Sequence, residues 1–180
     1  MVLGIFSILF SQLKYAFPIK LTSIYGADIQ DKFGVLLALY YLFAICFNLY
    51  YCKKESKRSC VQNLVIGGIL YTVSMLIMAV ADNAVLIGIS LAIWAVAQMI
   101  IVINNGAFVA ENCQAHNVGV LTVFYSNFSL SGVVTGPIVS RFIMQYFGLE
   151  ANWWGMVGLG MFGTGALLFM DKFKKNKTGK

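Results

Sequence analysis

This sequence of 180 residues consists mainly of long apolar runs, each close to the length of a membrane-crossing helix, and short polar gaps separate the runs. A helix needs about 20 predominantly apolar residues to cross the hydrocarbon core of a bilayer. The pattern therefore predicts an all-α integral membrane protein with six transmembrane helices. The approximate spans expected are 1–25, 33–52, 61–81, 84–110, 118–147 and 153–170.

Composition supports a lipid environment for these runs. Hydrophobic residues make up 59% of the chain and charged residues 11%, whereas soluble domains carry about 25% charged residues. The four cysteines, Cys46, Cys52, Cys60 and Cys113, show no CxxC spacing, so neither a disulfide framework nor a metal site is expected.

The basic residues indicate topology, and they do not suggest a nucleic-acid partner despite the net charge of +6. They gather after the second and sixth runs, and cytoplasmic loops of membrane proteins carry an excess of such residues. We therefore expect a multi-pass protein of the plasma (inner) membrane with both termini in the cytoplasm. The two clusters are Lys53, Lys54, Lys57 and Arg58, and Lys172, Lys174, Lys175, Lys177 and Lys180.

The first run is expected to be a transmembrane helix that begins at the initiator, and not a signal peptide. No basic region precedes it, and its apolar character continues past Ser11. Pro18 is expected to bend this helix.

Polar side chains share an arc in four of the six runs when positions are counted at about 100 degrees per residue. Because an unpaired amide in hydrocarbon costs several kcal/mol, we expect a shared cavity lined by the first, second, fourth and fifth runs. The third and sixth runs are expected to face lipid. The candidate residues of the substrate cavity are Gln12, Tyr15, Tyr41, Asn48, Trp94, Gln98, Asn105, Asn127, Ser131 and Arg141.

Several of these residues have a structural interpretation beside the functional one. Gln98 and Asn105 can contact substrate or can tie helices together through hydrogen bonds. Arg141 can meet an anionic group, meet a second half of the protein, or extend to the membrane interface. Lys14 lies outside the polar arc of its run. Its ammonium group is therefore expected to extend to the membrane interface or to bind a backbone carbonyl, in preference to contacting substrate.

Small residues in the fifth run predict close helix packing. Glycines four apart let another backbone approach, and a proline in the same helix frees a carbonyl and bends it. Gly132, Gly136 and Pro137 are therefore expected to be packing and bending residues.

The stretch from Ala107 to Gly148 resembles the second-last helical hairpin of a half of the major facilitator superfamily, where AxxxE, then G, then GxxxGP recur in that order. The residues that carry this resemblance are Ala107, Glu111, Gly119, Gly132, Gly136 and Pro137. The resemblance implies that residues 1–180 form one six-helix bundle of 3+3 inverted repeats.

Two further stretches refine the resemblance. Phe10–Gly26 is similar to the seventh helix of drug-exporter-like bacterial members, and the loop NLYYCKKESKR has Cys52 where the family loop GxLaDRxGRK has its aspartate. Both favour the C-terminal half of a twelve-helix transporter. The implied function is secondary active export of small organic or drug-like solutes by alternating access, with a second six-helix half as partner and no cofactor.

Enzymatic functions find no support in the sequence. There is no HExxH and no P-loop, and SLSG at Ser129 to Gly132 lacks the first glycine of GxSG. No carboxylate falls near the middle of a run, where a proton relay would be placed. The alternative to a transporter is a non-transporting truncated remnant or membrane assembly module. The acidic residues are Asp28, Asp31, Glu55, Asp82, Glu111, Glu150 and Asp171, and the one histidine is His116.

Overall fold

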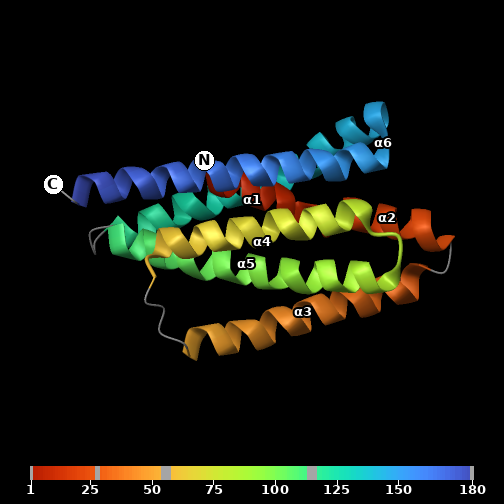
Figure 1. The fold of residues 1–180 in the computed structure, drawn as a ribbon, viewed down its shortest axis with the longest axis horizontal. Helices are drawn as coiled ribbons and strands as arrows, with labels where there is room; N and C mark the ends of the chain where they lie inside the picture. The colour runs from red at the N-terminus through yellow and green to blue at the C-terminus, as the bar shows by residue number, and fades with distance from the viewer. Residues whose placement is uncertain (1, 27–28, 54–57, 113–116, 179–180) are drawn as a thin grey trace.

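The computed structural model describes residues 2–26, 29–53, 58–112 and 117–178, which are helical apart from short turns and connections (Figure 1). The helices are α1 (Val2–Ser11), α2 (Ala16–Tyr25), α3 (Ile29–Lys53), α4 (Cys60–Val80), α5 (Ala84–Asn112) and α6 (Val118–Thr178). The residues discussed above that lie outside the described ones are Asp28, Lys54, Glu55, Lys57, Cys113, His116 and Lys180.

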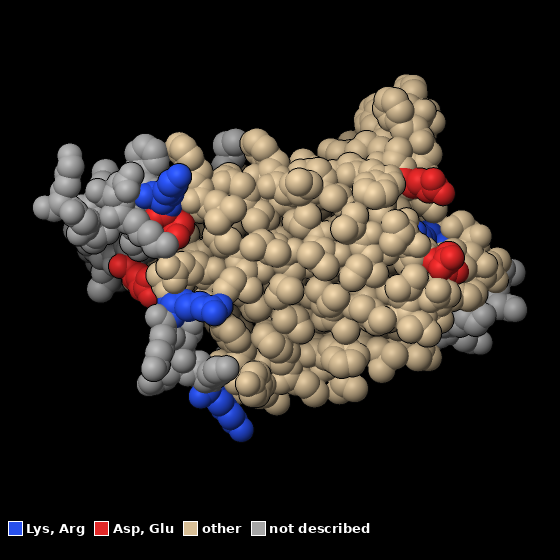
Figure 2. Space-filling view, in the orientation of Figure 1, with Lys and Arg blue, Asp and Glu red and all other residues tan. Residues whose placement is uncertain are grey.

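Four of the described helices are long and apolar enough to cross a membrane, over Phe33–Tyr51, Cys60–Val80, Ala84–Glu111 and Val118–Lys172. Figure 2 shows the charged side chains of one face gathered at the two ends of the molecule, with a broad uncharged belt between them. The prediction of an all-helical membrane protein is thus confirmed. These helices do not by themselves establish a count of six crossings, because the first expected span is interrupted and the last two lie within α6.

The interruption in the first span separates α1 from α2. The Lys14 N–H bonds to the Ser11 carbonyl three residues back at 3.1 Å, and the Phe17 N–H bonds to the Gln12 carbonyl five residues back at 2.9 Å. Pro18 follows directly, and its ring is incompatible with the carbonyl of the residue four positions earlier, which is Lys14. The helix therefore departs from regularity one turn before the proline that was expected to bend it.

The long helix α6 consists of two arms that double back on each other (Figure 1). Gly148 has φ 86° and ψ 172°, and it is the position inside α6 with non-helical dihedrals. A residue with a side chain rarely adopts such a φ, so glycine suits the turn. We call 118–147 the first arm and 149–178 the second arm; the helical dihedrals of the first arm continue through Pro137.

Side chains in the connecting segments help to set where α4 and α5 begin. Ser59 is the N-cap of α4, and its hydroxyl accepts a bond from the Gln62 N–H at 3.3 Å. Asn83 precedes α5, and its side-chain oxygen accepts from the Leu86 N–H at 2.9 Å. Each cap satisfies an N–H group that the first helical turn leaves without a partner.

Helix α4 lies in the middle of the bundle, packed on α5 and on α6, while α1 packs on α6 and α3 packs on α5. Half of the α4 span is buried, compared with 11% of the α3 span. The third run was expected to face lipid, but only one side of α4 is exposed and apolar. That side carries Ile69, Val73, Leu76 and Val80.

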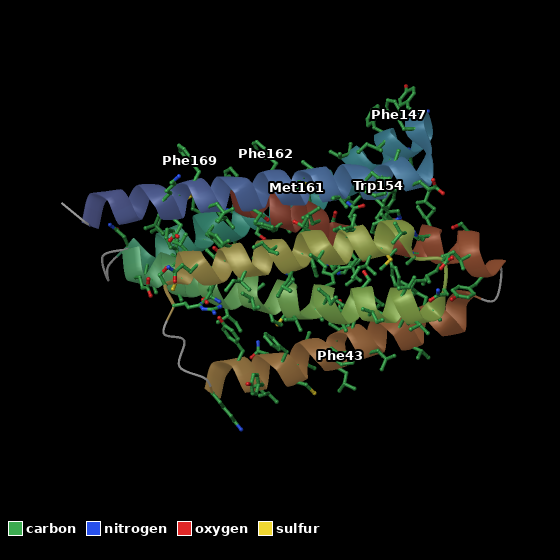
Figure 3. The ribbon with its side chains drawn as sticks, in the orientation of Figure 1. Phe43, Phe147, Trp154, Met161, Phe162 and Phe169 are labelled. Atoms are coloured by element: carbon green, nitrogen blue, oxygen red, sulfur yellow. The ribbon has the colours of Figure 1, made fainter. Side chains whose placement is uncertain are left out.

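The sixth run was also expected to face lipid, and the outer surface of the second arm of α6 is more broadly apolar than the exposed side of α4. Figure 3 shows large side chains directed away from the bundle there, and those of Trp154, Met161, Phe162 and Phe169 are all more than half exposed. In a membrane protein such a surface is solvated by lipid tails.

Candidate functional site

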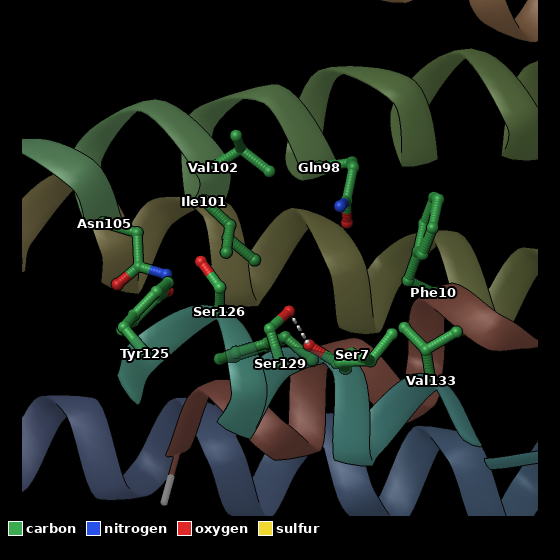
Figure 4. A pocket seen from close by; sticks show the side chains of 12 residues that line it. Ser7, Phe10, Gln98, Ile101, Val102, Asn105, Tyr125, Ser126, Ser129 and Val133 are labelled. Carbon is green, nitrogen blue, oxygen red and sulfur yellow. Dashed lines mark hydrogen bonds between the residues drawn. The ribbon is translucent and has the colours of Figure 1, made fainter. Parts of the chain in front are cut away.

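A cavity of about 340 Å³ lies between α1, α5 and the first arm of α6 (Figure 4). Its wall combines aromatic and aliphatic side chains with hydroxyl and amide groups. The lining residues are Phe6, Ser7, Phe10, Gln98, Ile101, Val102, Asn105, Tyr125, Ser126, Ser129, Leu130 and Val133. Helix α3 contributes none of them, although the second run was expected to line the cavity.

Two residues predicted from the sequence, Gln98 and Asn105, lie together in this wall. The Gln98 side-chain oxygen accepts a hydrogen bond from the Tyr71 hydroxyl at 2.9 Å, which ties α5 to α4. Asn105 is only 5% exposed, and its side-chain oxygen has no hydrogen-bond partner among the described residues. Gln98 thus has a helix-tying bond, whereas the Asn105 oxygen is left without one.

Sequence reasoning missed the hydroxyl groups of the same wall. Ser7 of α1 and Ser129 of α6 are hydrogen-bonded at 2.7 Å, and Tyr125 and Ser126 lie on the same arm (Figure 4). Tyr125 and Ser129 were recognisable as one polar arc of the fifth run. The prediction from the sequence instead favours the arc on the other side of that run, which contains Asn127 and Ser131.

Gln12 was predicted to line the cavity, and the structure places it in the core instead. Its side-chain oxygen accepts bonds from the Ser140 hydroxyl at 2.7 Å and from the Asn152 amide at 3.3 Å, and the residue is fully buried. Its amide donates to the Ile8 carbonyl at 3.1 Å. Gln12 therefore links the interruption of the first span to both arms of α6.

The remaining candidate residues also lie outside this cavity. Trp94 is fully buried, with its ring edge-on to those of Tyr40 and Tyr71 at 6.3 and 6.1 Å between centroids. Asn48 of α3 reaches the Met99 sulfur of α5 at 3.6 Å. Tyr15 is half-buried, and Tyr41, Asn127, Ser131 and Arg141 are exposed.

A second cavity, of about 770 Å³, lies where α2, the end of α4 and the turn of α6 meet. Buried Lys20 donates there to the carbonyl oxygens of Met78 and, at 3.0 Å, Ala79, and its ammonium group lies 5.8 Å from the centre of the Trp153 ring. These carbonyls end helix α4, where a cation is favoured. The Lys20 side chain is thus held in place by the carbonyl end of α4 and by the Trp153 ring.

Among the described residues, no group of three or more histidine, cysteine, aspartate or glutamate side chains is placed to hold a metal ion. The cavity between α1, α5 and α6 is lined by amides, hydroxyls and apolar groups only. Such a wall can bind a solute by hydrogen bonds and apolar contact.

Comparison with known proteins decides the family. The sequence model of the Major Facilitator Superfamily matches residues 1–180. The chain belongs to the major facilitator superfamily. The crystal structure of the human organic anion transporter MFSD10 (TETRAN) is similar to this facilitator chain, with a TM-score of 0.83 and 17% sequence identity.

At that level of identity, the likeness to MFSD10 shows the shared fold and nothing finer. The alignment covers 92% of the facilitator chain and 39% of the MFSD10 chain, so the chain spans well under half the length of that transporter. No curated protein matches its sequence. The family resemblance read from Ala107 to Gly148 is confirmed at the level of the superfamily.

Proposed function

We propose that the chain is one six-helix bundle of a secondary active transporter that exports small organic or drug-like solutes. In this proposal α1 and α2 together make the first crossing, α3, α4 and α5 make the next three, and the two arms of α6 make the last two. A second six-helix half completes the transporter, and transport proceeds by alternating access of a site near the middle of the membrane.

The observation that carries the proposal is a cavity with amide and hydroxyl groups in its wall, within a bundle whose long helices are apolar enough to cross a membrane. The amide and hydroxyl groups that meet in this cavity belong to Gln98, Asn105 and Ser129. Polar groups at such a depth are costly unless they meet water, a solute or one another, so they mark pathways. Superfamily membership supports a transported solute as the occupant.

Exposed polar side chains on the first arm of α6 support the proposal that a second six-helix half packs against this chain. Asn127, Ser131 and Arg141 are exposed on the first arm of α6. An exposed arginine and amide are unfavourable against lipid tails. A second bundle packed against this arm would cover them or enclose them with water in a shared pathway. We take the C-terminal half as the part of the transporter represented here, on the strength of the degenerate loop at 48–58.

Orientation follows from the distribution of lysine and arginine. Nine of the thirteen basic residues fall after the second and sixth runs, which supports a plasma-membrane protein with both termini in the cytoplasm. Export of drug-like solutes is supported by the similarity of Phe10–Gly26 to the seventh helix of bacterial drug exporters.

The test is an efflux measurement in cells that carry the gene with its natural flanking sequence. Cells are loaded with ethidium, a cationic dye, or with uncharged Nile red, and energy is restored. Faster dye loss than in cells with the gene deleted, abolished by an uncoupler, is the expected result. Unchanged efflux of both dyes, together with crosslinked homodimers of the chain, would favour the non-transporting assembly module.

A further inference from the structure

We propose that the exposed side of the first arm of α6 packs against a transmembrane helix from outside residues 1–180, and that this helix carries an aspartate or glutamate at the depth of Arg141. The contact rests on the second six-helix half proposed above and specifies the chemistry by which that half recognises this chain. A second copy of the chain is excluded from the same position.

Six exposed side chains form one stripe along the first arm. Their spacing of 4, 3, 4, 3 and 4 residues places them within an arc of about 80 degrees when each residue turns the helix by about 100 degrees. Helical dihedrals continue through Pro137, so this count holds along the arm. The stripe is about 27 Å long. We call it the outer stripe, and it consists of Asn127, Ser131, Val134, Ile138, Arg141 and Gln145.

The outer stripe faces away from the bundle. Gly132 and Gly136, which contact α1, lie on the opposite side of the arm. Val134 and Ile138, in the middle of the stripe, are both more than half exposed. Lipid tails can solvate these two aliphatic side chains, but they cannot solvate a guanidinium group. The mixture of aliphatic, amide and charged groups therefore suits a protein neighbour better than lipid.

Arg141 determines what this neighbour must carry. It lies within the long apolar span of α6, and no hydrogen bond or ion pair joins it to another residue that the structure describes. Arginine stays charged at physiological pH, and an unpaired charge removed from water is strongly unfavourable. Its planar set of N–H donors matches the two oxygens of a carboxylate. An aspartate or glutamate of the neighbouring helix is thus the partner that this side chain requires.

Contact of Arg141 with lipid headgroups would not account for the rest of the stripe. Arg141 is seven residues, or about 10.5 Å, from the turn at Gly148, so a long side chain could extend toward the interface. Ser131 and Asn127 lie about 15 Å or more farther along the same arm. A helix packed along the whole stripe covers all three residues at once.

Charge also excludes a second copy of this chain as the neighbour. Nine of the thirteen basic residues fall after the second and sixth runs, so all copies are expected to enter the membrane in one orientation. A symmetric pair then places equal residues at equal depth. Two Arg141 side chains would meet and repel each other, and the outer stripe contains no acidic residue to offset this repulsion.

A photo-crosslinking side chain at Ile138 tests the contact. The substitution Ile138→p-benzoylphenylalanine, one helical turn from Arg141, is made in cells that carry the gene with its natural flanking sequence. Adducts are mapped by mass spectrometry of the crosslinked peptides. We expect an adduct with a helix from outside residues 1–180 that has an aspartate or glutamate within about four residues of the attachment point, which is one turn.

The same probe at Phe162 is the control. Phe162 is similarly exposed, but it points away from the bundle on the second arm (Figure 3), and it should give no adduct with that helix. Three results at Ile138 overturn the proposal: no adduct with protein, an adduct between two differently tagged copies of this chain, or an adduct with a helix that has no acidic residue within one turn.

Charge reversal tests the ion pair itself. Arg141→Glu should lower the adduct yield at Ile138 about fivefold or more, relative to the amount of chain in the membrane, whereas Arg141→Lys should keep it within about twofold. An arginine in place of the acidic residue of the partner, combined with Arg141→Glu, should restore about half of the yield or more. A contact that does not depend on opposite charges would show no such rescue. An unchanged yield for Arg141→Glu, or the absence of rescue, overturns the pairing.

Pairing and transport can fail separately in these experiments. An adduct that depends on the acidic residue, without dye efflux in cells, leaves the pairing standing and contradicts the transport proposal. Dye efflux from cells in which Ile138 gives no adduct with protein does the reverse.

Discussion

Two neighbouring asparagines of α5 show how differently a buried amide can be used in this chain. The Asn104 amide donates to the Tyr51 hydroxyl at 3.0 Å and to the Ile100 carbonyl at 2.8 Å, and its oxygen accepts from Asn63 at 2.8 Å. The Asn105 oxygen has no such partner among the described residues. The first residue joins α3, α4 and α5, while the second faces the cavity.

Replacement of Asn104 should therefore lower stability through two helix contacts at once. We expect Asn104→Leu to reduce the free energy of unfolding by about 1–3 kcal/mol, because it leaves the Asn63 amide buried without its acceptor. Thermal unfolding in detergent measures the change. In a double-mutant cycle, Asn63→Leu and Asn104→Leu should be non-additive by about 0.5–2 kcal/mol. Strict additivity would show that the two amides are not coupled.

Lys20 offers a second prediction at this scale. Lys20→Met keeps most of the side-chain volume but removes the ammonium group that binds the Met78 and Ala79 carbonyls and lies over Trp153. The end of α4 then loses its donor, and we expect a loss of about 1–3 kcal/mol in unfolding free energy. Differential scanning fluorimetry can follow the shift in Tm. Lys14→Met, at an exposed position, is the matched control, and an equal shift in both variants would contradict this account.

The sequence was a good guide to some cavity residues and a poor guide to others, for physical reasons. Within α5 a uniform helical count puts Trp94, Gln98 and Asn105 on one side. The structure brings Gln98 and Asn105 into the cavity wall and packs Trp94 in the core. The same count could not say which arc of the fifth run faces α1, because that depends on Ser7, which contacts Ser129 from 122 positions away. Gln12 was misplaced because it lies where the helix is interrupted, so angles counted through it do not hold.

Among the helices, the closest approach that glycine makes possible is between α1 and the first arm of α6. A Cβ at Gly132 would lie 2.7 Å from the Ser7 Cβ, and one at Gly136 would lie 2.9 Å from the Ser11 Cβ. Real Cβ atoms are not found so close to their neighbours, so the two helices are in contact at their backbones. The small-residue spacing of the sequence indicated such a contact without naming its partner.

Glycine-to-alanine substitutions separate packing from helix propensity. We expect Gly136→Ala to destabilise the bundle by about 1–3 kcal/mol, since the added methyl group overpacks the contact with α1. Gly158→Ala, on the second arm, meets nothing within 4 Å and should be neutral or slightly stabilising, by up to about 1 kcal/mol. Equilibrium unfolding of the two variants gives the comparison. Similar stability of both would mean that the close approach does not matter for folding.

Helix ends were harder to anticipate than helix existence. The apolar runs predict the long helices because a helix needs about 20 apolar residues to cross a bilayer. They do not predict the interruption at 12–15, which begins before Pro18, nor that the second arm of α6 begins directly after Gly148 and not at about residue 153. Both features are set by backbone hydrogen bonds and dihedrals, to which hydrophobicity is insensitive.

At the scale of the whole molecule, the uncharged belt seen in Figure 2 restricts which side chains can stand on the outer surface. Phe162, labelled in Figure 3, points away from the bundle on the second arm of α6 and is 64% exposed. An arginine at the centre of a membrane helix costs about 2.5–3.5 kcal/mol on insertion scales. We expect Phe162→Arg to lower the fraction of chain recovered in the membrane, measured by fractionation and immunoblot.

Phe162→Leu is the control for that measurement, because it shortens the side chain without adding charge. Recovery of the leucine variant should equal that of the unmodified chain. If the arginine variant is recovered equally well, this side of the second arm faces protein or water instead of lipid.

The single oxygen atom of Gln12 that Ser140 and Asn152 share limits how the bundle can move. One atom fastens the turn between α1 and α2 to both arms of α6. Any motion that spreads those arms must break at least one of the two bonds, in a place that water does not reach readily. These two bonds therefore favour conformations in which the turn after α1 and both arms of α6 move together.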